Sequence, residues 1–175
     1  RAYAELGMRE ADADKRFDLF NAAVVALRRA RQLERTEGGA AALDLDVARM
    51  MELKAQAEEK HGSPEKAAAY RGDAVATYQT LILLGDASGS EIKPHIERAY
   101  RECLPLLLAI GKWSDAIEDA DRFLELFPGS PYAADMRTWK SQAQMKSLQT
   151  GNAAPAPAPT TAGSPPERQA TEPAR

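Results

Sequence analysis

The sequence has few of the side chains that build reactive sites. Its 175 residues include one cysteine, Cys103, and two histidines, His61 and His95. A single cysteine excludes an internal disulfide and a multi-cysteine metal site. The sequence also lacks an uninterrupted apolar run of about 18 residues, the length that a membrane-spanning helix needs. We therefore expect no direct membrane insertion.

Basic side chains are too few for a nucleic-acid-binding surface. The 23 Lys and Arg residues are outnumbered by 26 Asp and Glu residues, which gives a formal net charge of −3. Because phosphate neutralisation requires a basic surface, we expect no nucleic-acid partner. The most basic stretch contains Arg28, Arg29, Arg31 and Arg35. Glu34 and Glu37 lie within the same turns, which favours a solvated outer face with local ion pairs over a phosphate or anionic-lipid patch.

The few candidate reactive residues have structural explanations. Cys103 lies between Tyr100 and Leu107 on an apolar stripe, where a free cysteine packs as a small hydrophobe. His61 falls in the last turn of an expected helix, a position that suits a partly charged imidazole, and His95 falls in a first turn. The sequence also lacks a phosphate-binding loop, a Gly-rich dinucleotide fingerprint and a metal-ligand pair. We expect neither a catalytic site nor a metal or cofactor.

Helical periodicity dominates the chain, and no stretch alternates as a β-strand does. Apolar residues recur every three or four positions, which predicts an all-α fold. The expected helices are a short one near the N-terminus and longer ones at about residues 15–36, 44–61, 64–84, 94–110, 114–124 and 131–148.

Cap and breaker residues predict where these helices begin and end. Residues 36–39, Thr-Glu-Gly-Gly, are expected to end the first long helix, and Asp44 is expected to N-cap the next one. Ser63, followed by Pro64, is a second expected N-cap, and Ser114 is a third.

Pro105 interrupts the helix expected at residues 94–110. Proline lacks a backbone N–H and crowds the carbonyl one turn before it. Because Leu104 and Leu107 continue the apolar stripe on both sides, we expect a kink near Pro105 rather than a break, with Gly111 ending the helix.

Residues 97–130 carry an ordered series of small and large apolar positions. The series reads Tyr100-x2-Cys103-Leu104-x2-Leu107, Gly111-Lys112-Trp113, Ala116-x3-Ala120-x2-Phe123 and Pro128. It resembles the tetratricopeptide repeat, in which small residues let two antiparallel helices cross closely. Cys103-Leu104 departs from the usual Leu-Gly of that family, and Ala120 replaces its usual aromatic residue. The resemblance implies antiparallel helix hairpins stacked as a short right-handed α-solenoid, and a closed helical bundle is the alternative.

Weaker copies of this pattern occur elsewhere. Ala74-x3-Tyr78-x2-Leu81 and Phe17-x2-Phe20-x3-Val24-x2-Leu27 resemble a second repeat helix, and Tyr3-x2-Leu6-Gly7 resembles a first one. Residues 127–133, Phe-Pro-Gly-Ser-Pro-Tyr-Ala, are similar to the turn between repeats of bacterial envelope proteins. These matches imply about three hairpins, and they favour a bacterial periplasm or cell envelope over the cytoplasm.

The composition divides the chain into two segments. Residues 1–149 are expected to form the helical repeat domain, and residues 150–175 to form a disordered Pro/Ala-rich tail, because the tail has almost no large apolar side chain. The helix at 131–148 has one narrow apolar stripe, as a C-terminal capping helix does. The first helix has apolar residues and no capping residue, so we expect the chain to be the C-terminal part of a larger protein. Its N-terminal edge is then a candidate for self-association.

The resemblance also implies a binding surface. First helices of such repeats line a concave groove that receives a partner segment, and the corresponding positions here are Arg98, Arg101, Pro105 and Leu108. The two arginines favour an acidic partner. We therefore expect a non-catalytic protein–protein interaction scaffold. The alternatives are a structural solenoid segment that mediates self-assembly, or a non-catalytic appendage of an upstream enzyme domain.

Overall fold

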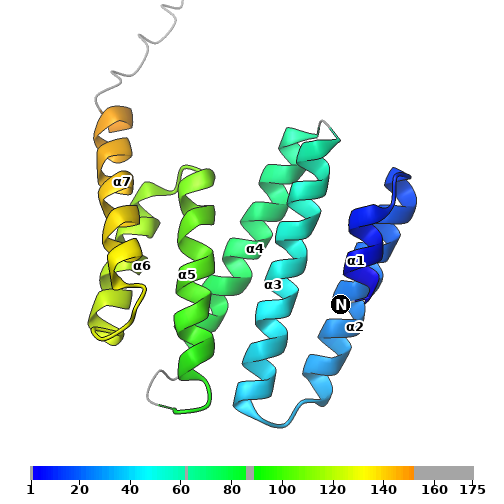
Figure 1. The fold of residues 1–175 in the computed structure, drawn as a ribbon, viewed down its shortest axis with the longest axis horizontal. Helices are drawn as coiled ribbons and strands as arrows, with labels where there is room; N and C mark the ends of the chain where they lie inside the picture. The colour runs from blue at the N-terminus through cyan, green and yellow to red at the C-terminus, as the bar shows by residue number, and fades with distance from the viewer. Residues whose placement is uncertain (1, 62, 86–88, 152–175) are drawn as a thin grey trace, which may run out of the picture.

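The part of the chain that the structure describes folds entirely into α-helices. The computed structural model describes residues 2–61, 63–85 and 89–151. The helices found there are α1 (Ala2–Arg9), α2 (Ala13–Leu33), α3 (Glu37–Lys60), α4 (Pro64–Leu84), α5 (Lys93–Ala109), α6 (Trp113–Leu126) and α7 (Ala133–Gly151) (Figure 1). The predicted all-α fold class is confirmed. Most of the expected disordered tail, residues 152–175, lies outside the described residues.

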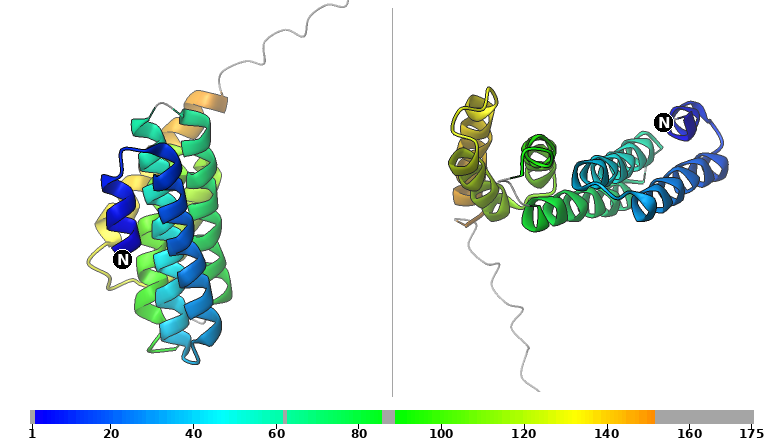
Figure 2. Two further views of the ribbon diagram at one scale, coloured as in Figure 1. Left: turned by 90° about the vertical axis from the view of Figure 1, so that its right-hand side faces the viewer. Right: turned by 90° about the horizontal axis from the view of Figure 1, so that it is seen from below.

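The helices pack as a two-sided row. Each helix contacts the next, and further contacts join α1 to α3, α3 to α5 and α5 to α7. Within the described residues, no Cα atom of α2, α4 or α6 comes within 8 Å of another even-numbered helix, and α1 does not approach α6 or α7 this closely. Seen from below, α1, α3 and α5 lie on one side and α2 and α4 on the other, and the ends of the row bend toward the first side (Figure 2). We call the side of the odd-numbered helices the inner face and the other side the outer face.

The turn between α2 and α3 differs from the prediction. Residues 36–39 do not end α2; instead Thr36 N-caps α3, and its Oγ1 accepts a hydrogen bond from the Gly39 N–H at 3.1 Å. A Cβ atom at Gly39 would lie only 2.6 Å from Cδ of Glu34, whose carboxylate binds the backbone of this turn, so the site favours glycine. Asp44, the expected N-cap, lies inside α3.

Of the two other predicted caps, Ser63 is confirmed in position and Ser114 is wrong. Ser63 occupies the N-cap position of α4, but its side chain makes no capping hydrogen bond, and Pro64 at the first helical position starts the helix. Helix α6 begins at Trp113 with Lys112 at the N-cap, so Ser114 lies inside the helix. An acidic first turn complements the helix dipole here, which makes a hydroxyl cap unnecessary.

Helix α5 continues through Pro105 without a break, as predicted. It ends at Ala109 with Ile110 as its C-cap. Gly111, the predicted stop, follows directly, and its φ of 77° lies in the left-handed region that glycine adopts without strain. The expected bend at Pro105 stays a prediction.

The helix pair α5–α6, which carries the best repeat match, contributes many of the fully buried side chains of the core. The Tyr100 ring packs edge-on against Phe123 at a centroid distance of 5.7 Å. Cys103, Ala116 and Ala120 are fully buried in the same core, as their positions in the repeat pattern imply. Small side chains at these crossing points leave no room for a larger residue.

The two ends of the row differ in how well they are covered. Met136 and Ala143 of α7 are fully buried, so its predicted apolar stripe packs against the preceding hairpin. At the other end, Tyr3 and Leu6 of α1 are about half exposed. Phe17 of α2 was expected on the buried stripe but is 43% exposed.

The burial of Ala120 gives the first testable prediction. Ala120→Phe should reduce the free energy of unfolding by about 1–3 kcal/mol, because an aromatic ring overpacks a site without free volume. The control is Ala134→Phe, an equal enlargement at an exposed position of α7. Chemical denaturation of both variants measures the difference, and equal stability of the two would show that the α5–α6 crossing is open.

Candidate functional site

The four predicted partner-binding residues share one stripe of α5. Arg98, Arg101, Pro105 and Leu108 are three or four positions apart, so they lie on the same side of the helix. Arg98 and Pro105 are exposed, and Arg101 and Leu108 are half-buried. Since α5 contacts α3 on one flank and α7 on the other, the stripe lies between two further inner-face helices.

The two arginines of this stripe are held by neighbouring groups. Arg98 Nε lies 2.7 Å from Oε1 of Glu102, and Arg101 Nη2 lies 3.6 Å from the same oxygen. The Arg101 guanidinium also lies over the Tyr132 ring, 4.6 Å from its centroid. Glu102 therefore partly neutralises the positive charge that the sequence places here.

Leu108 belongs to a small hollow where α5 meets α7. The hollow has a volume of about 260 Å³. Besides Leu108, its lining consists of Trp113, Gln142, Met145, Lys146 and Gln149. Met145 is 58% exposed, so this end of the stripe offers apolar surface next to polar side chains.

Helix α3 adds a second stripe that the sequence analysis did not identify. Six residues that are not fully buried recur every three or four positions along one side of this helix: Ala42, Asp46, Arg49, Leu53, Gln56 and Lys60. The two stripes are electrostatically linked, because the pKa of Arg98 is raised chiefly by its hydrogen bond to Glu102 and further by the charge of Asp46. Four of these six residues are polar, but α3 is polar on more than one side, so their spacing does not by itself identify one face of the helix.

A buried tyrosine of α4 connects the two helices that carry these stripes. The Tyr78 hydroxyl, on α4, lies 2.5 Å from Oε1 of Glu52 on α3 and 2.9 Å from Oε2 of Glu102 on α5. Tyr78 is fully buried, and burial together with these carboxylates raises its pKa far above the usual value, so it stays a neutral hydrogen-bond donor.

The outer ends of this network are surface arginines. Arg49 Nη1 lies 2.5 Å from Oε2 of Glu52, as Arg98 lies against Glu102. The result is a continuous polar connection from the α3 stripe to the α5 stripe. It fixes the side chains of two helices in one arrangement at the inner face.

A second buried polar group, Lys54, is enclosed by protein groups. Its Nζ donates a hydrogen bond to Oδ1 of Asn21 at 3.0 Å, and it lies 4.8 and 4.2 Å from the ring centroids of Phe17 and Tyr70. Burial lowers the pKa of Lys54. Phe17 thus stays at the surface side of a cation–π contact rather than in the core, which explains its unexpected exposure.

Burial also governs the residues around Cys103. Desolvation raises the pKa of the Cys103 thiol well above its usual value and raises that of Tyr100 to about 12. Both groups are therefore protonated at neutral pH. Asp119 is buried beside them, its Oδ2 has no hydrogen-bond partner among the described residues, and burial raises its pKa as well.

The basic stretch of α2 is paired differently from the prediction. Arg31 Nε contacts both carboxylate oxygens of Asp44 on α3, at 3.2 and 3.1 Å. It does not pair with Glu34 or Glu37, which were expected to form local ion pairs with this stretch. The pairing runs between helices because Asp44 lies inside α3 and faces α2.

No other type of site is found in the part of the chain that the structure describes. Residues 2–61, 63–85 and 89–151 contain no group of three or more His, Cys, Asp or Glu side chains arranged to hold a metal ion. In the same residues no helix is long and apolar enough to cross a membrane. No family model, curated protein or solved structure matches the chain.

The Tyr78 network predicts a specific loss of stability. Tyr78→Phe should reduce the free energy of unfolding by about 1–3 kcal/mol, because buried Glu52 loses a donor and stays desolvated. Tyr70→Phe is the matched control, since the Tyr70 hydroxyl makes no hydrogen bond to the described residues and its ring remains under Lys54. Urea denaturation measures both. If the Tyr78→Phe protein were as stable as the control, the hydrogen bonds of the Tyr78 hydroxyl would not stabilise the inner face.

Asp119 predicts a pH-dependent effect. Its folded-state pKa is raised, so the folded protein binds more protons than the unfolded chain above pH 3.8, the ordinary value, and stability falls as the pH rises through that window. Asp119→Asn should therefore melt at a higher temperature than the parent at pH 7, with the difference shrinking toward pH 4. Asp121→Asn, which breaks the exposed pair with Lys140, should change stability by less than about 1 kcal/mol. A melting-temperature difference for Asp119→Asn that grows on acidification would contradict the assignment.

Proposed function

We propose that the helical domain is a tetratricopeptide-like α-solenoid that binds a segment of a partner protein on its inner face. The arrangement of contacts supports the solenoid over the closed bundle. Odd-numbered helices contact one another, even-numbered helices of the described residues do not, and the first helix stays away from the last two. Unequal spacing on the two sides curves a row of hairpins, whereas a closed bundle brings its first and last helices together.

The observation that carries the binding proposal is the pair of stripes on α3 and α5. They lie side by side, they expose both apolar and charged side chains, and the Tyr78 network holds them in register. A preorganised surface binds with less loss of side-chain entropy than a mobile one. Leu53 and Leu108 provide apolar contacts on the two helices.

The partner that suits this surface is an extended or helical segment with acidic side chains. Arg49, Arg98 and Arg101 have their charged groups at the surface, whereas the carboxylates of Glu52 and Glu102 also bind the buried Tyr78 hydroxyl. The guanidinium groups are therefore the charged groups that an acidic segment contacts at this surface. The module is proposed to be non-catalytic, and the periplasmic or envelope location rests on the sequence resemblance alone.

A second candidate function, self-association, is favoured by one observation. Tyr3 and Leu6 are half exposed on α1, at the end of the row where no further helix of the described residues covers them. Apolar side chains at an open end of a repeat array favour packing against another helix.

The inner-face proposal predicts charge-dependent binding. Peptides selected from a random display library on the parent protein should lose at least tenfold in affinity toward the double variant Arg98→Glu, Arg101→Glu at low salt. The control is Arg122→Glu, which reverses an exposed arginine on outer-face helix α6. Isothermal titration measures each affinity. Peptides that bind the double variant and the parent equally would place the binding surface elsewhere.

A further inference from the structure

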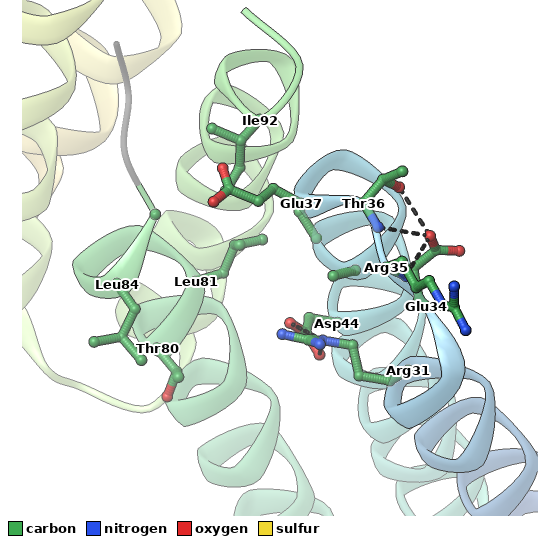
Figure 3. A pocket seen from close by; sticks show the side chains of 13 residues that line it. Arg31, Glu34, Arg35, Thr36, Glu37, Asp44, Thr80, Leu81, Leu84 and Ile92 are labelled. Carbon is green, nitrogen blue, oxygen red and sulfur yellow. Dashed lines mark hydrogen bonds and ion pairs between the residues drawn. The ribbon is translucent and has the colours of Figure 1, made fainter. Parts of the chain in front are cut away.

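Helix α2 has two accessible sides. One side borders an open groove, with α3 as its floor and α4 as its far wall (Figure 3). Arg31 and Asp44 pair directly in this groove, at 3.1 Å. The charged residues that line it are three arginines and three carboxylates: Arg28, Arg31, Arg35, Glu34, Glu37 and Asp44. Equal numbers of both signs on one surface do not identify an occupant, so this side of α2 carries no proposal.

The other accessible side of α2 faces away from the rest of the row. Among the described residues, only α1 and α3 bring Cα atoms within 8 Å of α2. On the far side from them, Val25 is 66% exposed and Leu33 is 75% exposed. Six exposed residues three or four positions apart form a line along this side, which we call the α2 stripe: Asp14, Asp18, Ala22, Val25, Arg29 and Leu33.

The spacing of the α2 stripe is the same in both directions of the chain. Successive residues are four, four, three, four and four positions apart. A second copy of the helix, laid antiparallel to the first, therefore meets the stripe position by position. Asp18 then lies opposite Arg29 of the second copy, and Ala22 lies opposite Val25 of the second copy. Because a twofold axis relates the copies, each of these pairs occurs twice.

The charges of the stripe are complementary in this antiparallel arrangement. Asp18 and Arg29 are eleven residues apart, about 16.5 Å along the helix axis, so they cannot pair within one copy. Among the described residues, neither has an ion-pair partner within 4 Å. A parallel arrangement would place each of them opposite its own like charge. The antiparallel arrangement turns both into pairs of opposite charge.

The neighbouring charges do not oppose this register. The same antiparallel alignment places Lys15 opposite Gln32 and Arg28 opposite Leu19 of the second copy. Asp14, at the start of the stripe, lies opposite the uncharged Leu33. No charged residue of the stripe or its flanks therefore faces a like charge across the interface.

The centre of the stripe suits the close packing of two helices. Ala22 and Val25 lie on either side of the twofold axis, and exposed Ala26 adjoins them. Small side chains at a crossing point let two helix axes approach closely. Apolar burial at the centre supplies affinity, and the two ion pairs beside it set the register. One helix from each copy buries less than the roughly 800 Å² per partner of a standard interface, so the association is weak.

We propose that the chain forms a weak twofold dimer in which the α2 stripes of two copies pack antiparallel. The proposal rests on the self-association candidate stated above and gives it one surface and one geometry. Tyr3 and Leu6 of α1 are not part of the stripe, so the two surfaces can be tested separately. The inner face is free in this dimer, because α3 and α5 contribute nothing to the stripe.

Sedimentation velocity of the full chain tests for the dimer. Measured from about 10 μM to about 1 mM at low salt, the parent protein should dimerise reversibly with a dissociation constant below about 1 mM. Added salt should weaken the dimer, because exposed ion pairs set its register.

Two charge-reversed variants test the geometry. Asp18→Arg and Arg29→Asp each place like charges at both pairs, so each variant alone should dimerise at least tenfold more weakly than the parent. An equimolar mixture of the two restores two pairs of opposite charge and should form a heterodimer about as tight as the parent dimer. The parent net charge of −3 becomes −1 in Asp18→Arg and −5 in Arg29→Asp, so both variants stay negative and net charge does not draw them together.

Matched controls make the same net-charge changes outside the stripe. Asp135→Arg on α7 and Arg122→Asp on α6 alter exposed residues, and each should change the dissociation constant by less than about twofold. A double variant, Tyr3→Ser with Leu6→Ser, tests the open end of α1 and should also leave the dimer intact. Circular dichroism confirms that each variant is folded.

Four results would overturn the proposal. The first is a parent protein that stays monomeric at 1 mM. The second is dimerisation of the charge-reversed variants at the parent affinity, and the third is a mixture of them that fails to associate. The fourth is a dimer lost only in the α1 double variant, which would assign self-association to Tyr3 and Leu6. Peptide binding by the inner face is measured separately, so these results leave that proposal to its own test.

Discussion

One hydroxyl group connects the three central helices. Tyr78 of α4 reaches a carboxylate of α3 and a carboxylate of α5, and each carboxylate is bound in turn by a surface arginine. A neutral phenol is suited to this position, because it donates a hydrogen bond without adding a charge to a dry site. Interdigitated apolar side chains already restrict how neighbouring helices pack, and this polar connection adds a constraint that favours one register. The same register fixes the position of the exposed stripe on α3 relative to the stripe on α5.

Periodicity predicts the helices well and their ends less well. The apolar spacing depends on 3.6 residues per turn, and buried positions such as Met136 and Ala143 follow it. The ends depend on side chains that lie near one another only after folding. Residues 36–39 have the composition of a helix end, yet they begin α3, because Glu34 and Thr36 bind the exposed amides and glycine leaves them space.

The candidate surface was predictable on one helix and not on the other. The α5 stripe follows from a repeat pattern, and the structure places its four residues on one side of the helix. The α3 stripe depends on which helix lies beside α5, and sequence spacing does not contain that information. The same limit applies to Lys54, a residue that normally indicates exposure. It is buried because Phe17, Asn21 and Tyr70, on two other helices, surround it.

The two faces of the row obey different constraints because they have different spacing. On the inner face, helices approach closely, so buried carboxylates must be paired and the arginines that pair them are partly neutralised. On the outer face, α2 and α4 stand apart in the part of the chain that the structure describes, so α3 is uncovered between them. The two faces therefore differ in what they offer: ion-paired side chains join neighbouring helices on the inner face, whereas an open groove lined by three arginines and three carboxylates lies between α2 and α4 on the outer face. The spacing that produces the first surface also produces the second, because helices that converge on one side of a row must separate on the other.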